Sequence, residues 1–150
     1  MSAINVTPAQ PDDKEPWRIL FEGYRRFYRQ PEDPAVAETV WGWVLDPAHP
    51  TTCLLARDAS GAIVGLAHYR DLPRPLSGTT AGFLDDLFVI PEARGSGIAE
   101  TLIEAVAAEG KLRGWSWLRW FTAEDNYRAR AVYDRVASLS QWKTYQRDIG

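Results

Sequence analysis

The sequence predicts an α/β fold with a mixed, mostly antiparallel central sheet flanked by helices, in the order β-α-α-β-β-β-α-β-α-β. Four segments have apolar residues at helical spacing, and runs of strand length lie between them. Residues 83–106 read as a strand, a glycine-bearing turn and a helix. With 150 residues, 45% of them hydrophobic, the chain is long enough for one core and too short for two. We therefore expect residues 1–150 to form a single domain.

A strand and two helices are expected before residue 50. The strand covers Ala3–Thr7, and Asp12 or Asp13 then caps a helix. Apolar and aromatic side chains keep helical spacing over three turns of this helix, which predicts a buried face formed by Trp17, Leu20, Phe21, Tyr24, Phe27 and Tyr28. A second, short helix covers residues 36–44.

The middle of the chain predicts a hairpin followed by a loop. Residues 51–57 and 62–69 are strand-like runs, and the turn Asp58–Gly61 between them favours a tight antiparallel reversal. Residues 71–82 contain two prolines and two glycines. This composition predicts a long, mobile loop at the rim of a site.

Two strands and two helices alternate after this loop, and a last strand ends the chain. A buried strand at residues 84–90 stops at a proline, and apolar residues at three- and four-residue spacing then predict a helix over residues 98–106. An aromatic strand at residues 115–121 precedes a helix over residues 126–136, capped by Asp125 or Asn126. A final strand is expected at residues 142–149, where it closes the sheet.

Composition limits the partners. The net charge is −3, the pI is about 5.4, and no run of Lys or Arg occurs, so neither nucleic acid nor an anionic membrane is an expected partner. No segment is apolar over about 18 residues, and the N-terminus lacks the features of a signal peptide. The single cysteine, Cys53, cannot form an internal disulfide. These features predict a cytoplasmic protein, and no metal site is expected.

The turn Arg94–Gly97 lies where a helix N-terminus opens, so that unpaired N–H groups, the helix dipole and an arginine converge. This arrangement is suited to a phosphate. A P-loop is excluded because the G-x-x-x-x-G-K-[ST] pattern is missing. A dinucleotide fingerprint starting at Gly95 is excluded because Glu100 stands where glycine or alanine is required.

Two separated motifs resemble those of the GCN5-related N-acetyltransferases, the GNAT superfamily. Residues Arg94 to Ala99 match R-x-x-G-x-A, the acyl-CoA pyrophosphate loop, and Asn126, Ala129 and Tyr133 match N-x-x-A-x-x-x-Y. The resemblance covers roughly residues 62–145. Within the family, the sequence is similar to the polyamine, histone and D-amino-acid acetyltransferase branches. It departs after the last helix, where Ala137-Ser138 replaces the family's Gly-Phe.

The resemblance implies acetyl-CoA as co-substrate and a GNAT-like sheet. It assigns donor binding to the end of one strand, to the turn that opens the following helix, and to the start of the last helix. These residues are Leu87, Phe88, Val89, Arg94, Gly95, Ser96, Gly97, Ile98, Ala99, Asn126 and Ala129. Tyr133 is the implied acid that protonates the leaving thiolate. A tyrosine with a pKa near 10 is a plausible donor to a thiolate.

Asp85 and Asp86 are adjacent in the predicted strand, so we expect them to point to opposite faces. The resemblance nominates Asp85 as the base, acting through water, and Asp86 as a contact for the cationic substrate. Glu124 adds to an acidic rim around the site. The expected acceptor is therefore a small cationic primary amine, polyamine-like or amino-acid-like. A protein lysine or N-terminus, or a catalytically silent acyl-CoA-binding domain, stays open as an alternative, and a homodimer is possible.

Overall fold

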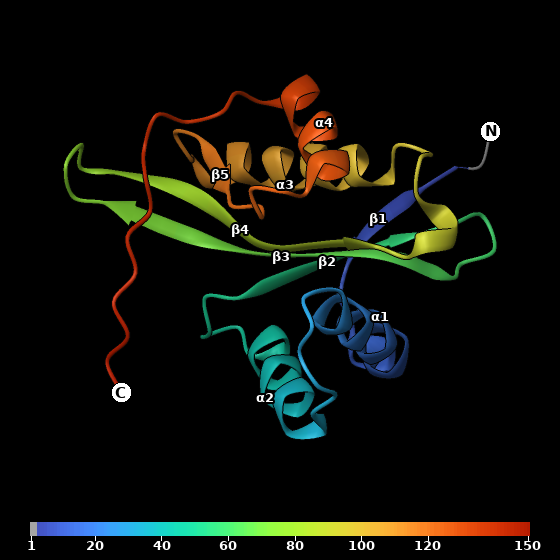
Figure 1. The fold of residues 1–150 in the computed structure, drawn as a ribbon. Coiled ribbons are helices and arrows are strands. Elements are labelled where there is room, and N and C mark those ends of the chain that lie inside the picture. The colour runs from blue at the N-terminus through green and yellow to red at the C-terminus, as the bar shows by residue number, and fades with distance from the viewer. Residues whose placement is uncertain (1–2) are drawn as a thin grey trace.

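The computed structural model describes residues 3–150 and contains one five-stranded sheet in the order β1-β2-β3-β4-β5 (Figure 1). Neighbouring strands are antiparallel from β1 to β4, and β5 runs parallel to β4. The predicted mixed, mostly antiparallel sheet is therefore confirmed. The strands are β1 Asn5–Pro8, β2 Thr52–Arg57, β3 Ile63–Arg74, β4 Thr79–Val89 and β5 Leu118–Trp120.

Four α-helices cover the two faces of the sheet, and all four were predicted. Helices α1 and α2 lie on one face, and α3 and α4 lie on the other (Figure 1). Their bounds are α1 Lys14–Phe27, α2 Pro34–Leu45, α3 Ile98–Arg113 and α4 Tyr127–Val136. Short 3-10 turns precede α1 (Pro11–Asp13) and follow β4 (Pro91–Ala93). Within residues 3–150, none of the helices combines the length and the apolar character that crossing a bilayer requires.

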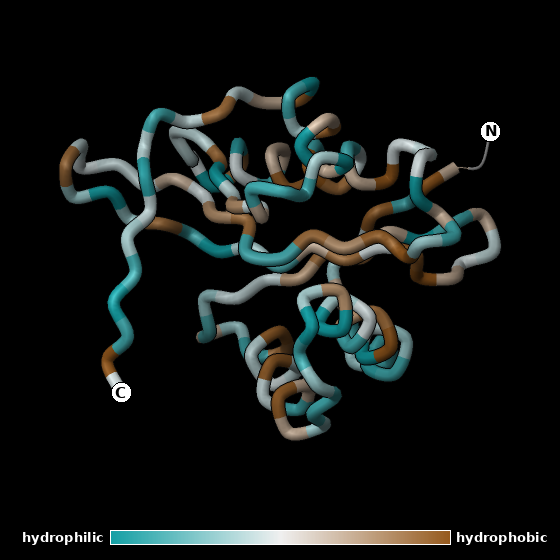
Figure 2. Tube along the Cα trace, in the orientation of Figure 1, coloured by the Kyte–Doolittle hydropathy of each residue, from teal (hydrophilic) through white to brown (hydrophobic). Residues whose placement is uncertain are grey.

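The sheet separates two hydrophobic cores, because successive strand residues point to opposite faces. Leu66 packs with α1 and α2, and Ala67, the next residue of β3, packs with α3. The largest fully buried side chain on the α1 side is Trp17, and Leu102 is fully buried on the α3 side. Figure 2 shows the hydrophobic residues concentrated along the middle of the sheet.

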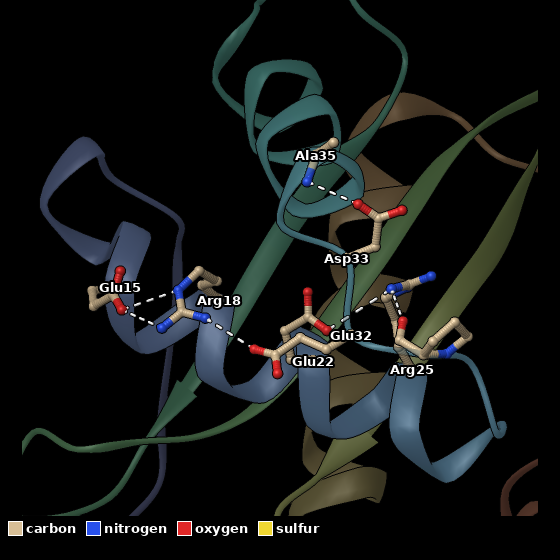
Figure 3. Close-up of polar contacts among 8 residues, drawn as sticks. Glu15, Arg18, Glu22, Arg25, Glu32, Asp33 and Ala35 are labelled. Atoms are coloured by element: carbon tan, nitrogen blue, oxygen red, sulfur yellow. Dashed lines mark hydrogen bonds and ion pairs between the residues drawn. The ribbon is translucent and has the colours of Figure 1, made fainter.

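Polar contacts fix the connection between α1 and α2 (Figure 3). Arg25 Nη1 donates to the Pro31 carbonyl oxygen at 2.7 Å and lies 3.8 Å from a carboxylate oxygen of the buried Glu22. The Asp33 carboxylate caps α2 by accepting from the Ala35 N–H at 3.0 Å. The C-terminal end of α1 is thereby tied to the segment that leads into α2.

Asp13 is the residue before α1, as predicted, but its carboxylate does not cap that helix. It accepts instead from the Gln10 N–H and from Arg57 Nη2, both at 2.8 Å. Asp13 therefore ties the start of α1 to the end of β2.

The predicted loop at residues 71–82 is wrong. These residues extend β3 and β4 into one long hairpin that projects beyond the other strands (Figure 1). The reversal needs only Pro75–Gly78, because Gly78 takes a φ of 65° and its N–H donates to the Arg74 carbonyl oxygen at 2.9 Å. Pro73 is accommodated within the hairpin opposite Thr80.

The predicted strand at residues 142–149 is also wrong, since residues 137–150 form no helix or strand. Trp142, Tyr145 and Ile149 are 72%, 94% and 92% exposed. Strand propensity reflects the fit to a pleated, half-buried surface, and no neighbouring strand supplies one here. In the view of Figure 1 the tail starts at α4, crosses the β3–β4 hairpin and ends on the side of the sheet where α1 and α2 lie.

Trp115 lies before β5 and not within the predicted strand at 115–121, which is reduced to Leu118–Trp120. A methyl group on Gly82 or on Gly110 would lie 2.2 Å or 2.1 Å from the Trp115 ring. The indole N–H of Trp115 also donates to Asp71 at 2.7 Å. Two glycines thus make room for one indole between β4 and α3.

Candidate active site

The turn between β4 and α3 presents unpaired backbone N–H groups. Gly95 and Gly97 have φ angles of 84° and 82°, in the left-handed region that glycine adopts without strain. The Thr101 N–H donates to the Gly97 carbonyl oxygen at 3.0 Å, the first bond of the helix. The N–H groups of residues 98–100 therefore have no helical partner. Together with the helix dipole they favour an anion, as the sequence predicted.

Arg94 lies along the wall of the site and does not extend into solvent. Its Nε donates to the Val89 carbonyl oxygen at 3.0 Å, and its guanidinium carbon lies 5.6 Å from the Phe27 ring centroid and 5.5 Å from that of Phe88. Ser96 donates its hydroxyl to the Ala93 carbonyl oxygen at 2.6 Å. The Ser96 hydroxyl is therefore already used within the turn.

Strand β4 has an open edge beside this turn. Its parallel pairing with β5 ends at Leu84. The Ile90 N–H donates to the Val64 carbonyl oxygen on the β3 side, and alternate residues of a strand direct their backbone groups to the same neighbour. Phe88 therefore faces β3, while the backbone N–H groups of Leu87 and Val89 and the Leu87 carbonyl face the open side. The Val89 carbonyl oxygen also faces this side but already accepts from Arg94. Of the three predicted backbone contacts for the donor, only Leu87 and Val89 have the right direction.

The turn, the open edge and the start of α4 surround one pocket of about 250 Å³. Most of the residues predicted to bind the donor line this pocket, together with the predicted acid: Leu87, Phe88, Val89, Arg94, Gly95, Gly97, Ile98, Ala99, Asn126, Ala129 and Tyr133. Ser96, Asp85, Asp86 and Glu124 are not among the lining residues. Tyr24, Phe27 and Tyr28 of α1 complete the wall.

Asp85 and Asp86 lie on the same side of the sheet, so the prediction of opposite faces is wrong. The register of β3 against β4 shifts after the pair His68 and Asp86, and Asp85 is the extra residue of a β-bulge. Asp86 Oδ2 lies 2.8 Å from His68 Nδ1, and Asp85 Oδ2 accepts from Arg70 Nε at 3.0 Å. His68 and Arg70 share one face of β3 because they are two residues apart. Both carboxylates therefore contact the face that α1 covers.

A buried line of hydrogen bonds leads from the core to Asp86. The indole N–H of Trp17 donates to His68 Nε2 at 3.0 Å, and His68 Nδ1 contacts Asp86. Trp17 is 0% and His68 is 1% exposed, while the Asp86 side chain is 26% exposed. Burial raises the pKa of Asp86, but the hydrogen bonds that it accepts from His68 and Tyr24 outweigh burial, so that the pKa lies below its usual value.

The protonation state of His68 depends on opposing contacts. Burial lowers its pKa, while the Cys53 sulfur and the Asp86 carboxylate raise it, to about 10. That value corresponds to an imidazolium at neutral pH. The indole N–H of Trp17 contradicts an imidazolium, because it can only donate and needs a bare Nε2 as acceptor. The neutral ring with its proton on Nδ1 satisfies both contacts, because Nε2 then accepts from Trp17 and Nδ1 donates to Asp86.

Three tyrosines gather between Asp86 and the pocket. Burial and the nearby Asp86 carboxylate raise the pKa of Tyr24 and of Tyr28. Tyr133 is partly buried, packs edge-on against Trp120 at 5.4 Å, and has its pKa raised by burial and then by Tyr28. All three hydroxyls therefore keep their protons at neutral pH.

The Asp85 carboxylate is paired rather than free. Burial raises its pKa, and the Arg70 hydrogen bond and charge oppose the rise. Arg70 uses only its Nε for Asp85, and its guanidinium lies 5.0 Å from the Phe83 ring centroid. Among residues 3–150, its two terminal nitrogens have no hydrogen-bond partner within the protein.

The start of α4 is fixed by Asn126, the predicted cap. Its side-chain oxygen accepts from the Ala129 N–H at 3.4 Å, and both residues line the pocket. Glu124 lies in the preceding loop and is exposed. The Glu124 carbonyl oxygen accepts from Arg130 at 2.6 Å.

Sequence reasoning missed four residues of this site: Tyr24, Tyr28, His68 and Arg70. The tyrosines were assigned to a buried helix face, and one side of that face does reach the pocket. His68 and Arg70 lie in a run that was predicted only as a strand, and no motif marked either of them as a functional residue. A histidine and an arginine two residues apart on a strand next to an acidic pair could have indicated the two ion contacts.

The chain matches known acetyltransferases over nearly its whole length. The model of the acetyltransferase (GNAT) family matches residues 17–137. D-amino-acid N-acetyltransferase HPA3 of Saccharomyces cerevisiae is 30% identical over 146 residues, which are 97% of this chain and 91% of that protein.

Solved structures agree with the fold. The ribosomal-protein-alanine N-acetyltransferase from Brucella melitensis biovar Abortus 2308 superimposes with a TM-score of 0.84 and 26% identity, covering 98% of this chain and 100% of that one. AAC(6')-Iy, in complex with the bisubstrate analog CoA-S-monomethyl-acetylneamine, superimposes with a TM-score of 0.85 and 20% identity, covering 99% of both chains. The chain therefore belongs to the acetyltransferase (GNAT) family, and it is an N-acetyltransferase whose acetyl donor is acetyl-CoA.

Proposed function

We propose that this enzyme transfers the acetyl group of acetyl-CoA directly to the primary amine of a small molecule that resembles an amino acid or a polyamine. The observation that carries the proposal is the meeting of three parts in one place. The anion-binding turn before α3 and the open edge of β4 share a pocket with Tyr133, and Asp86 adjoins the tyrosines of that pocket.

The pocket suits the donor. The N–H groups at the start of α3 are matched to a pyrophosphate, and a Cβ atom at Gly95 or Gly97 would meet no other atom within 4 Å, so the space beside the turn is open. The N–H groups of Leu87 and Val89 and the Leu87 carbonyl are suited to the amide groups of the pantetheine arm, which adds to the strand edge as a peptide does. Arg94 contributes positive charge at the pocket wall.

The donor supplies an activated acetyl group and a thiol leaving group. The bound ammonium ion first loses one proton to become a nucleophile. The amine nitrogen then forms a bond to the acetyl carbon, the carbon–sulfur bond breaks, the nitrogen loses another proton and the sulfur gains one, so that one proton is released overall. We assign the first proton to Asp85 through a water molecule, and burial raises the pKa of Asp85 in the direction that a base needs. We assign to Tyr133 the proton that the sulfur gains, because its raised pKa keeps the hydroxyl protonated.

The acceptor should bind as an ammonium ion at Asp86, with Glu124 on the outer rim. Arg70 pairs with Asp85 and offsets its charge, so the site is less acidic than the sequence suggested, while the neutral His68 leaves the charge of Asp86 in place. The unpaired terminal nitrogens of Arg70 are suited to a carboxylate. This observation favours an amino acid over a polyamine, in agreement with the D-amino-acid activity named for the yeast relative.

An acetyl-transfer assay with matched acceptors tests the proposal. Amino acids of both configurations are compared with their amides, with polyamines and with a peptide bearing an N-terminal alanine. Turnover of amino acids above their amides, lost in Arg70→Gln, is the expected result. Preference for the peptide supports protein acetylation instead, and transfer to none of these acceptors supports a silent acyl-CoA-binding domain.

We also propose a homodimer in the cytoplasm. The exposed apolar side chains of the tail, Trp142, Tyr145 and Ile149, support association with a second copy. Light scattering of the intact chain and of a chain ending at Ala137 tests this, and equal masses for both would contradict a role of the tail. The single, buried Cys53 is consistent with a reducing compartment.

A further inference from the structure

His68 is a buried titratable residue with both ring nitrogens engaged. Trp17 donates to Nε2 at 3.0 Å, and Nδ1 lies 2.8 Å from Asp86. The reaction steps assigned to Asp85 and Tyr133 make no use of this pair. The buried His68 and the Trp17 indole form a chain of hydrogen bonds to the partly exposed Asp86 carboxylate. Burying these polar groups costs free energy that an apolar core would not require.

Trp17 cannot easily move away from His68. Its ring stacks on Phe21 at 4.8 Å between centroids and contacts Trp41 at 4.9 Å, and none of its surface is exposed. The Phe21 ring also packs edge-on against His68 at 5.8 Å. The direction of the indole N–H is therefore fixed by the core between α1, α2 and the sheet.

The fixed donor has a consequence for the charge of Asp86. While Trp17 donates to Nε2, His68 carries one proton, on Nδ1, and donates it to Asp86. An imidazolium would neutralise the carboxylate, but a neutral ring orients it and leaves its negative charge in place. The groups that face His68 and Asp86 are Cys53, Tyr24, Tyr28 and the Asp85 carboxylate, which Arg70 pairs.

We propose that Trp17 and His68 are positioning residues that hold Asp86 as an oriented, un-neutralised anion, and that this anion selects the ammonium form of the acceptor. The proposal rests on the proposed function, because it names how the acceptor site obtains its charge. Trp17 and His68 touch neither the acceptor nor the donor. Their contribution is to the binding of a charged amine and not to the transfer step.

The first test measures the histidine itself and does not depend on turnover. The chain has two histidines, so a His49→Gln variant assigns the signals of His68 in long-range proton–nitrogen spectra. We expect a protonated Nδ1 and a bare Nε2 at pH 7. Two protonated nitrogens, or a proton on Nε2, would overturn the proposal even if the enzyme acetylates amines as proposed.

The second test compares Trp17→Phe with Trp41→Phe. Both remove an indole from the same aromatic cluster, but only Trp17 donates to His68. In Trp17→Phe the KM of a cationic amine should rise about tenfold, the scale of one weakened charge-assisted contact. The kcat, and the KM of an amine that is uncharged at the assay pH, should stay unchanged.

The pH profile separates positioning from a general packing defect. Without the indole, Nε2 of His68 can take a proton, so kcat/KM of Trp17→Phe for the cationic amine should fall at low pH relative to wild type. Trp41→Phe should keep the wild-type profile. Equal changes in both variants, or equal changes for charged and uncharged amines, would reduce Trp17 to a packing role and overturn the proposal.

Discussion

Replacement of Gly110 by alanine tests the packing between α3 and β4, because two effects predict opposite signs. Gly110 lies inside α3, where alanine is the better helix former by about 1 kcal/mol. The sequence alone therefore predicts a more stable protein. The structure predicts a less stable one, because the new methyl group would lie 2.1 Å from the Trp115 ring.

The size of the loss follows from what surrounds the indole. The Trp115 ring cannot move away from α3, because it also lies against Gly82, where a Cβ atom would be 2.2 Å from the ring. Its N–H is also hydrogen-bonded to Asp71 at 2.7 Å. Overpacking of this kind costs about 1–3 kcal/mol, and the lost hydrogen bond costs about 1 kcal/mol. After subtraction of the gain in helix propensity, about 1–3 kcal/mol of destabilisation remains.

Urea unfolding followed by far-UV circular dichroism measures this change. Gly42→Ala is the matched control, because Gly42 lies in α2 and a methyl group there meets no atom within 4 Å. The control should be stabilised by about 0.5–1 kcal/mol. In a Trp115→Ala background, Gly110→Ala should likewise stabilise.

A Gly110→Ala variant as stable as wild type or more stable, with Gly42→Ala behaving as expected, would refute the packing of Trp115 against α3. A loss of stability that persists in the Trp115→Ala background would refute it as well. In that case the cost of the methyl group would come from another neighbour.

Three further outcomes are expected. Tyr133→Phe keeps the edge-on packing on Trp120 and should lower kcat by roughly 10²–10⁴ at saturating acetyl-CoA with little change in KM; turnover equal to wild type would remove its role as acid. Arg94→Ala should weaken acetyl-CoA binding in calorimetric titration while the fold stays intact, because positive charge at the pocket wall is lost; unchanged affinity would exclude Arg94 from the donor site. The pKa of Asp86 is lowered in the folded protein because the hydrogen bonds from His68 and Tyr24 outweigh burial, so its stabilising contribution is complete above the unfolded pKa of about 3.9 and disappears as the pH falls through the folded pKa. The free energy of unfolding of wild type should therefore exceed that of Asp86→Asn at pH 7 and approach it in strong acid, and a gap independent of pH would contradict the assignment.

The sequence was a good guide wherever periodicity and a burial pattern agreed. The spacing of Trp17 and Phe21 predicted α1, and that of Ile98 and Leu102 predicted α3, because each stripe has one apolar face to bury. The glycine-bearing turn was also predictable from local sequence, because Gly95 and Gly97 adopt positive φ angles that other residues rarely take.

What could not be predicted depends on partners distant in sequence. The bulge at Asp85 arises from a register shift between two strands, and alternation within β4 alone gives the wrong face. Residues 142–149 have strand propensity but no strand beside them. His68 gained a role only because Trp17, 51 residues away, donates to it.

The open edge of β4 also bears on how this enzyme tolerates mutation. The groups that Leu87 and Val89 offer to a donor belong to the main chain, and every amino acid except proline supplies both of them. Genetic drift at these two codons can therefore change packing without erasing the ligand contacts. Alanine scanning will undercount this part of the site for the same reason, and a proline scan, which deletes one N–H at a time, is the screen that can find it.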